Sequence, residues 1–100
     1  MKDTKEVKRI ELYESEAGRL YFVDRVTDRA VRMFGYITAD TSFEEEAVSY
    51  SEQWTVGDCS ERYALNGTVL TRTSDPAGSS AVDLDDCALV AVYTSQIEYP

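Results

Sequence analysis

Carboxylates are the most abundant side chains in this sequence that could do chemistry. Two acidic clusters stand out: Glu44, Glu45 and Glu46 within SFEEEAVSYSEQW (residues 42–54), and Asp83, Asp85 and Asp86 within AVDLDD (residues 81–86). The aspartates could offer oxygen ligands to Ca²⁺ or Mg²⁺, but they lack the spacing, the glycine and the bidentate glutamate of an EF-hand loop. A carboxylate pair could also hydrolyse a glycoside, but a chain of 100 residues leaves little room for the required cleft. We therefore expect acids that are solvated or meet a partner, and no metal site.

The other reactive groups argue against an enzyme. The sequence has no histidine, which excludes catalytic triads built on histidine. Acid–base catalysis at neutral pH would then need a carboxyl or thiol group whose pKa is shifted towards neutrality. It also has no glycine-rich phosphate-binding motif. Cys59 and Cys87 form no CxxC pair, so we expect two reduced thiols, with a disulfide as the alternative. Asp58 and Glu61 disfavour a nucleophilic thiolate at Cys59. We expect no catalytic residue and no cofactor.

Charge is divided unevenly along the chain, whose formal net charge is -9. Residues 1–39 hold eight basic and seven acidic residues, whereas residues 40–100 hold two basic and twelve acidic residues. A surface this acidic repels nucleic acid, so we expect no direct binding of DNA or RNA. If segments 42–54 and 83–86 approach each other, their field would attract a lysine- or arginine-rich protein surface. Helix chemistry and solubility are the ordinary alternative, because acids near a helix N-terminus are favoured by its dipole.

Residues 42–54 are predicted to form the helix that carries the first cluster. Its apolar residues recur at helical spacing on one stripe: Phe43, Ala47, Tyr50 and Trp54. Ser42, followed by Glu45 three residues later, matches a capping box. A strand is the alternative, with one face formed by Val48, Tyr50, Trp54 and Val56 but also by Glu52.

Strands are predicted for most of the remaining chain. Residues 7–13, 19–26 and 30–38 alternate in the way that a meander requires. Asn66-Gly67 predicts a hairpin with a type I′ turn. Residues 87–93, CALVAVY, are apolar on both faces, which predicts a central strand covered on two sides. Residues 74–80 read as a loop, and residues 94–100 as an extension or tail.

These elements predict an α+β fold, an antiparallel sheet of five or six strands with one helix packed across it. A small all-β sandwich or barrel is the alternative. The length predicts a single compact domain over residues 1–100, and the apolar content of 43% suffices for a globular core. No apolar run has the length of a signal peptide or membrane span, so we expect a cytoplasmic protein and read Asn66-Gly67-Thr68 as a turn, not a glycosylation site.

The chain resembles a class of small acidic proteins, encoded by phages and mobile elements, that block host defence. Anti-CRISPR inhibitors and DNA-mimicking anti-restriction proteins belong to this class. The resemblance lies in size, in charge, in the lack of a catalytic motif and in the acidic segments SFEEEAVSYSEQW and AVDLDD. It implies stoichiometric binding to a protein machine in the host cytoplasm, such as a CRISPR effector complex, over the basic groove where nucleic acid would lie.

Under this interpretation the partner-binding residues are Glu44, Glu45, Glu46, Glu52, Asp83, Asp85 and Asp86. Tyr50 and Trp54 are candidate aromatic anchors, although their spacing favours a place in the core. The alternative is a generic acidic adaptor or assembly component that binds through apolar or strand-edge contacts. The two hypotheses differ in salt dependence, because only the electrostatic surface should lose affinity as salt rises.

Overall fold

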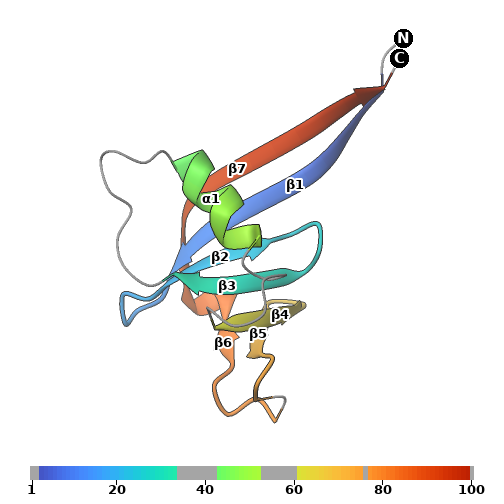
Figure 1. The fold of residues 1–100 in the computed structure, drawn as a ribbon. Coiled ribbons are helices and arrows are strands. Elements are labelled where there is room, and N and C mark those ends of the chain that lie inside the picture. Colours follow the sequence, from blue (N-terminus) through green and yellow to red (C-terminus); the bar gives the residue numbers. More distant parts are fainter. Residues whose placement is uncertain (1–2, 34–42, 53–60, 76, 100) are drawn as a thin grey trace.

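The computed structural model describes residues 3–33, 43–52, 61–75 and 77–99, in which the chain forms a seven-stranded antiparallel sheet and one α-helix (Figure 1). The elements are β1 (Asp3–Glu14), β2 (Leu20–Asp24), β3 (Arg29–Met33), α1 (Phe43–Glu52), β4 (Arg62–Asn66), β5 (Val69–Arg72), β6 (Val82–Asp83), the 3₁₀ turn η1 (Leu84–Asp86) and β7 (Ala88–Tyr99). The strand order is β6-β5-β4-β3-β2-β1-β7. The α+β prediction is confirmed at this level, with a sheet larger than the five or six strands expected.

One face of the sheet, the helix face, is covered by α1. Alternate residues of the first three strands point to this face and bury Ile10, Leu12, Phe22 and Val31 against Ala47 of the helix. The Phe22 ring stacks on Phe43 and Tyr50, with centroids 6.0 and 4.8 Å apart. The apolar stripe from Phe43 to Tyr50 is therefore the surface that attaches the helix, and the prediction of a helix over a strand is confirmed for residues 43–52.

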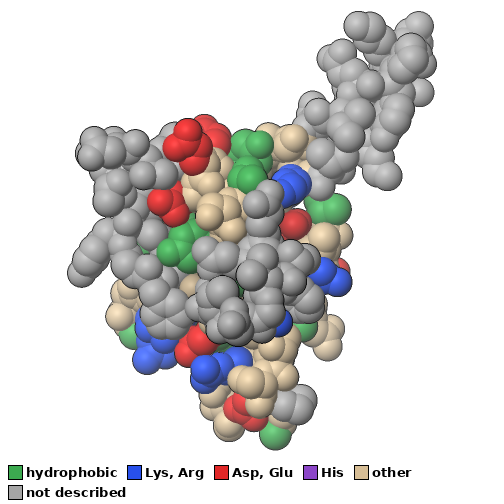
Figure 2. All heavy atoms as spheres, viewed as in Figure 1, with side chains coloured by type: hydrophobic (Ala, Val, Ile, Leu, Met, Phe, Trp, Pro, Cys, Tyr) green, Lys and Arg blue, Asp and Glu red, His purple; other side chains and the backbone are tan. Residues whose placement is uncertain are grey.

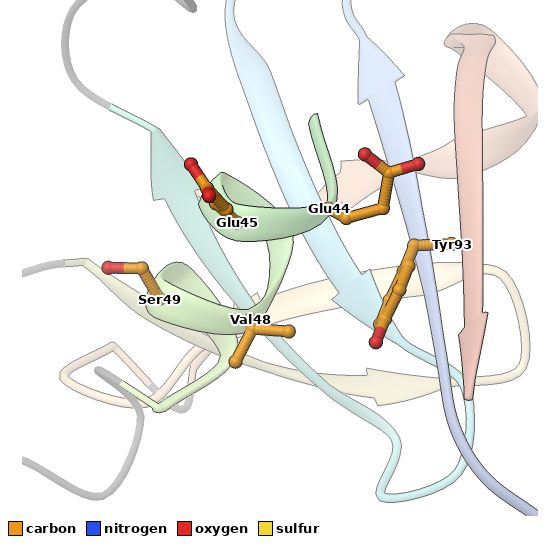
Figure 3. A pocket seen from close by; sticks show the side chains of 5 residues that line it. All are labelled: Glu44, Glu45, Val48, Ser49 and Tyr93. Atoms are coloured by element: carbon orange, nitrogen blue, oxygen red, sulfur yellow. The ribbon is translucent and has the colours of Figure 1, made fainter. Parts of the chain in front are cut away.

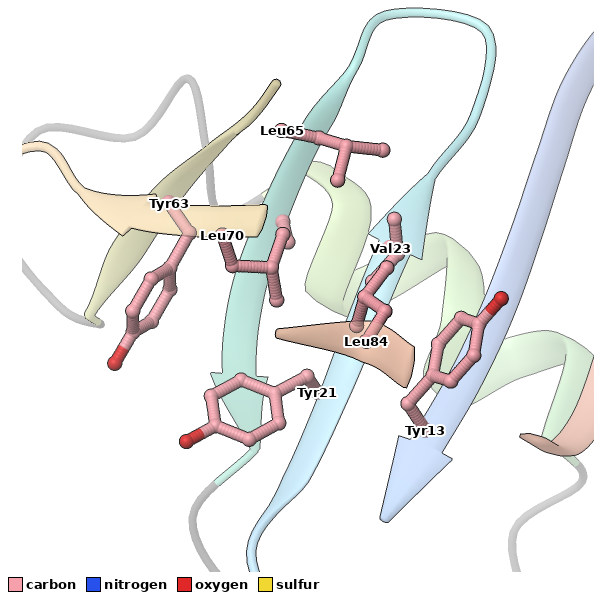
Figure 4. Packing of buried hydrophobic residues seen from close by; sticks show 8 residues of the cluster. Tyr13, Tyr21, Val23, Tyr63, Leu65, Leu70 and Leu84 are labelled. Carbon is pink, nitrogen blue, oxygen red and sulfur yellow. The ribbon is translucent and has the colours of Figure 1, made fainter. Parts of the chain in front are cut away.

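The opposite face, the tyrosine face, holds a second core. It consists of Tyr13, Tyr21, Val23, Ala30, Tyr63, Leu65, Leu70 and Leu84. Tyr21 and Tyr63 meet edge to face, with centroids 5.5 Å apart. Leu84 follows β6 at one end of the sheet yet packs in the same cluster as Tyr13 of β1, so the sheet curls around this core (Figure 4).

The hairpin around Asn66-Gly67 forms, but its turn lies one residue later than predicted. Asn66 pairs with Val69, so the two central residues are Gly67 and Thr68. Gly67 has a φ of +65°, whereas the φ of Thr68 is not positive. Positive φ at the first central residue alone defines a type II′ turn, because a type I′ turn requires it at both. This register places Leu65 opposite Leu70, where both are buried on the tyrosine face.

Strand β7 corrects a second prediction. Residues 87–93 were expected in a central, doubly covered strand, but β7 lies at the edge of the sheet, next to β1. The exposed fractions of Leu89, Val90 and Val92 are 51%, 55% and 41%. The same apolar sequence pattern is expected for a strand covered on both faces and for an edge strand whose apolar side chains are exposed, so the pattern does not distinguish them. The predicted tail also belongs to this strand, which continues to Tyr99.

The first and last strands form a long ribbon. β1 and β7 have 12 residues each and pair from Asp3 opposite Tyr99 to Glu14 opposite Ala88. Together they extend beyond the other strands, with both chain ends near the tip (Figure 1). β1 therefore begins earlier than the predicted residue 7, and the part of the predicted strand 30–38 beyond residue 33 lies outside the described residues. In the described ranges, no helix is long and apolar enough to cross a membrane.

Candidate protein-binding surfaces

The start of α1 forms one wall of an open hollow of about 470 Å³ beside β7. The hollow is lined by Glu44, Glu45, Val48, Ser49 and Tyr93 (Figure 3). The four helix residues lie one and four positions apart, so they share a flank next to the stripe that packs on Phe22. Glu44 and Glu45 are exposed, whereas Glu46 is half-buried. Acidic side chains gather over this end of the helix (Figure 2). We call this site the helix–β7 groove.

The second acidic cluster is fixed by η1. Asp83 is its N-cap, because its carboxylate accepts a 3.0 Å hydrogen bond from the backbone N–H of Asp85. Leu84 is buried on the tyrosine face, and its backbone N–H donates to the carbonyl of Thr68 at 2.7 Å. Asp85 and Asp86 are exposed. The buried leucine and the cap thus hold two carboxylates at the surface.

The β1–β2 turn adds acids that the sequence interpretation missed. Glu14 and Glu16 share with Asp85 and Asp86 a hollow of about 490 Å³, also lined by Ser15, Cys87 and Ala88. We call these four acids the turn–η1 surface. The turn and η1 meet because Glu14, the last residue of β1, pairs with Ala88, the first of β7. That long-range pairing has no local signal in the sequence.

The acids of this region affect the pKa of the neighbouring Cys87 thiol. Burial raises the pKa of its thiol, and the negative charges of Asp86, Asp83 and Glu16 raise the pKa further. A thiol in such surroundings is a poor nucleophile at neutral pH. Cys87 is a free, half-buried thiol, and Cys59 lies outside the described residues.

The two predicted acidic clusters do not converge. Ala47 of α1 packs with Phe22 on the helix face, whereas Leu84 of η1 packs with Tyr21 on the tyrosine face. Phe22 and Tyr21 are neighbours in β2 and point to opposite sides of the sheet, which therefore separates the clusters. Glu52 ends α1, and its side chain lies outside the described part of the chain. Trp54 also lies outside the described residues, and Tyr50 is half-buried and packs against the core of the helix face.

Two other glutamates are bound within the fold. Glu11 is buried and points to the tyrosine face. Its carboxylate accepts hydrogen bonds from Arg25, from Arg9 at 3.2 Å and from the Tyr13 hydroxyl at 3.0 Å. Arg25 also donates to the Tyr13 hydroxyl at 2.8 Å. Burial raises the pKa of the Glu11 carboxyl, but the hydrogen bonds from Arg25 and Tyr13 and the charge of Arg25 outweigh burial and hold the pKa below its usual value.

Glu61 is held by the same combination of residue types. Its carboxylate lies 3.0 Å from Arg72 and 3.5 Å from Arg32, and it accepts a 2.8 Å hydrogen bond from the Tyr63 hydroxyl. Burial raises the pKa of Glu61, but Tyr63 and the two arginines lower it by more. Burial and the bond to Glu61 raise the pKa of Tyr63, so its hydroxyl remains a donor. Four arginines thus neutralise two internal glutamates.

Neither metal-binding geometry nor similarity to known proteins assigns a role to these surfaces. In the described ranges, no group of three or more His, Cys, Asp or Glu side chains is arranged to hold a metal ion. Comparison with models of known families, with curated proteins and with solved structures gives no match.

Proposed function

We propose that this chain is a non-enzymatic, phage-encoded inhibitor that binds a positively charged protein surface and blocks it. The proposed target is the basic nucleic-acid groove of a host defence complex such as a CRISPR effector. The observation that supports this best is the turn–η1 surface, where acids from two distant segments line one hollow. Carboxylates gathered in this way present the charge that a basic groove attracts.

The local structure supports a recognition role for these carboxylates. Asp85 and Asp86 are set on η1, which the Asp83 cap and buried Leu84 anchor. Carboxylates on an anchored segment lose little conformational freedom on binding, so more of the electrostatic attraction contributes to affinity. The four arginines bound to Glu11 and Glu61 have their charge offset within the fold by those two glutamates. The acids near η1 have a basic neighbour, because Arg19 lines an adjoining hollow with Glu16, Asp83 and Asp86.

The test is displacement of labelled target DNA from guide-loaded CRISPR effectors. We expect the wild-type chain to release DNA from at least one effector in a panel, and to do so less well as ionic strength rises. A variant with Glu14→Gln, Glu16→Gln, Asp85→Asn and Asp86→Asn should lose about tenfold or more in potency, because association is slower without the charge.

Asp28→Asn supplies the control, matched to the single change Asp86→Asn. Asp28 is exposed in the β2–β3 turn with φ of +55°, which asparagine tolerates. The two variants remove the same charge, but only Asp86→Asn should reduce potency. Absence of DNA release across the panel, or equal potency of the four-residue variant and the wild type, would contradict the proposal.

An acidic adaptor that binds through strand-edge contacts is the second candidate, favoured by the exposed apolar side chains of β7. Such an adaptor should bind its partner with little salt dependence. The four-residue variant would then retain full affinity.

A further inference from the structure

The outer edge of β7 is paired with no strand of the described ranges. In the described part of the chain β7 pairs with β1 alone, so one side of its backbone takes no part in the sheet. Natural edge strands are usually protected by lysine, proline, short length or a bulge. β7 has 12 residues, no lysine and no proline, and its one charged residue is Glu98. Its pairing with β1 shifts register twice, between Leu89 and Ala91 and between Ser95 and Gln96, and the segment from Ala91 to Ser95 pairs without interruption.

One side of this edge is apolar. Val92 lies opposite Glu11 and Leu89 opposite Tyr13, which places both on the tyrosine-face side of β7. Three of the four exposed large apolar residues in the described ranges belong to this strand, at positions 89, 90 and 92. Exposed apolar side chains gathered on an edge strand are typical of a surface that another chain covers.

The other side of the edge carries the carboxylates of Glu44 and Glu45, with Lys8 further along, opposite Ser95. Tyr93 lies opposite Ile10 and so points to the helix face, where it lines the helix–β7 groove with Glu44, Glu45 and Val48 (Figure 3). A lysine or arginine there would lay its aliphatic stem on Tyr93 and Val48 and bring its charge to the two carboxylates. The groove therefore suits a long basic side chain.

We propose that β7 accepts an extended segment of a partner protein as an additional strand. Because successive side chains of a strand point to opposite faces, the segment alternates basic and apolar residues. The basic residues enter the helix–β7 groove, and the apolar residues cover Leu89 and Val92. This inference rests on the proposed function, since it takes the partner to be basic, and it specifies a second contact on the other side of the sheet.

A second copy of this chain fits the edge less well than a basic segment. A two-fold pairing of β7 with β7 would place both helices on the same face of one continuous sheet. Glu44 and Glu45 of the two copies would then face each other across the joint, in a chain whose net charge is -9. Like charges placed together oppose such an interface.

The probe is a fluorescent peptide of about seven residues in which arginine and valine alternate, compared with a peptide of the same composition in block order. We expect the alternating peptide to bind about tenfold more tightly, because charge and composition are equal and only the alternation differs. On binding, those amides of residues 91–95 that face away from β1 should become protected from hydrogen exchange. Equal affinities, or no protection of β7, would overturn the inference.

Variants on the two sides of the strand sharpen the test. Glu44→Gln with Glu45→Gln should weaken peptide binding about tenfold at low salt, and Val92→Thr, which keeps the β-branched shape, about threefold. Glu16→Gln with Asp86→Asn removes two charges from the turn–η1 surface and should change peptide affinity by less than about twofold. A larger loss in that control than in the groove variant would contradict the assignment.

The outcomes separate this inference from the proposed function. Peptide binding without DNA release would support the strand-binding site on β7 and contradict the proposed inhibitor function. DNA release that depends on the turn–η1 surface, without peptide binding at β7, would do the reverse. A dimer in sedimentation that the peptide disperses would show that the occupant is a second copy, and the proposal of a basic partner segment would be wrong.

Discussion

Glu11 and Glu44 are the same residue type in opposite surroundings. The Glu11 side chain is 8% exposed and is bound by two arginines and a tyrosine, whereas Glu44 is exposed beside the helix–β7 groove. Glu61, at 19% exposure, belongs with Glu11. The comparison separates acids that are bound within the fold from acids that remain exposed at its surface. It also shows that position in the sequence does not decide the role, because Glu61 comes from the acidic part of the chain.

Replacement of Glu11 should have the largest effect on stability. Glu11→Ala leaves Arg25, whose side chain is 31% exposed, and the buried Tyr13 hydroxyl without their acceptor. Removing one partner of a buried ion pair is strongly destabilising, and partial exposure of the arginine moderates the loss to about 3 kcal/mol. Urea unfolding measures it. An equal loss for Glu44→Ala would erase the distinction between the two classes of glutamate.

Glu61→Ala should follow with a loss of about 2 kcal/mol in the free energy of unfolding. The effect is smaller because the Glu61 side chain is more exposed than that of Glu11, and solvent can reach the arginines that it leaves behind. Calorimetric melting of both single variants and the double variant checks this. The two losses should add, because the networks share no residue.

Acid should weaken the same two networks by less than either substitution, because a protonated carboxyl keeps its packing. The pKa values of Glu11 and Glu61 are lowered in the fold from an ordinary value of 4.5. Their contribution is therefore complete above about pH 4.5 and is lost as the pH falls through their folded pKa values. The wild-type melting temperature should decrease from about pH 6 to about pH 3, and Glu11→Gln should show a shallower decrease. A parallel decrease in both proteins would contradict this.

Glu44→Gln should have the smallest effect on the fold. Glu44 lies in the first turn of α1, where a negative charge interacts with the helix dipole by about 0.3 to 1 kcal/mol. Thermal melting should detect a loss within that range, while association with a basic partner slows most at low salt. If melting changes and association does not, the acids at the start of α1 serve helix chemistry alone.

Local signals in the sequence predicted local structure. The stripe from Phe43 to Tyr50 identified the helix, and Asn66-Gly67 located a hairpin, although the burial of Leu65 against Leu70 shifted its turn. Pairings between distant segments had no such signal. The position of β7 beside β1 decides that its apolar residues are exposed, and it also joins Glu14 and Glu16 to η1. The acidic surface that forms is therefore different from the one predicted.

The long ribbon of β1 and β7 has a consequence for the order of folding. β1 is synthesised before the other described strands, but β7, its partner on one side, is synthesised after all of them. Until β7 is synthesised, β1 is itself an edge, and Ile10 and Leu12 lack the cover of Ala91 and Tyr93. Pairing over so long a sequence separation is slow. The nascent sheet therefore passes through a stage in which its β1 edge can pair with other chains, and this stage ends only when the last strand docks.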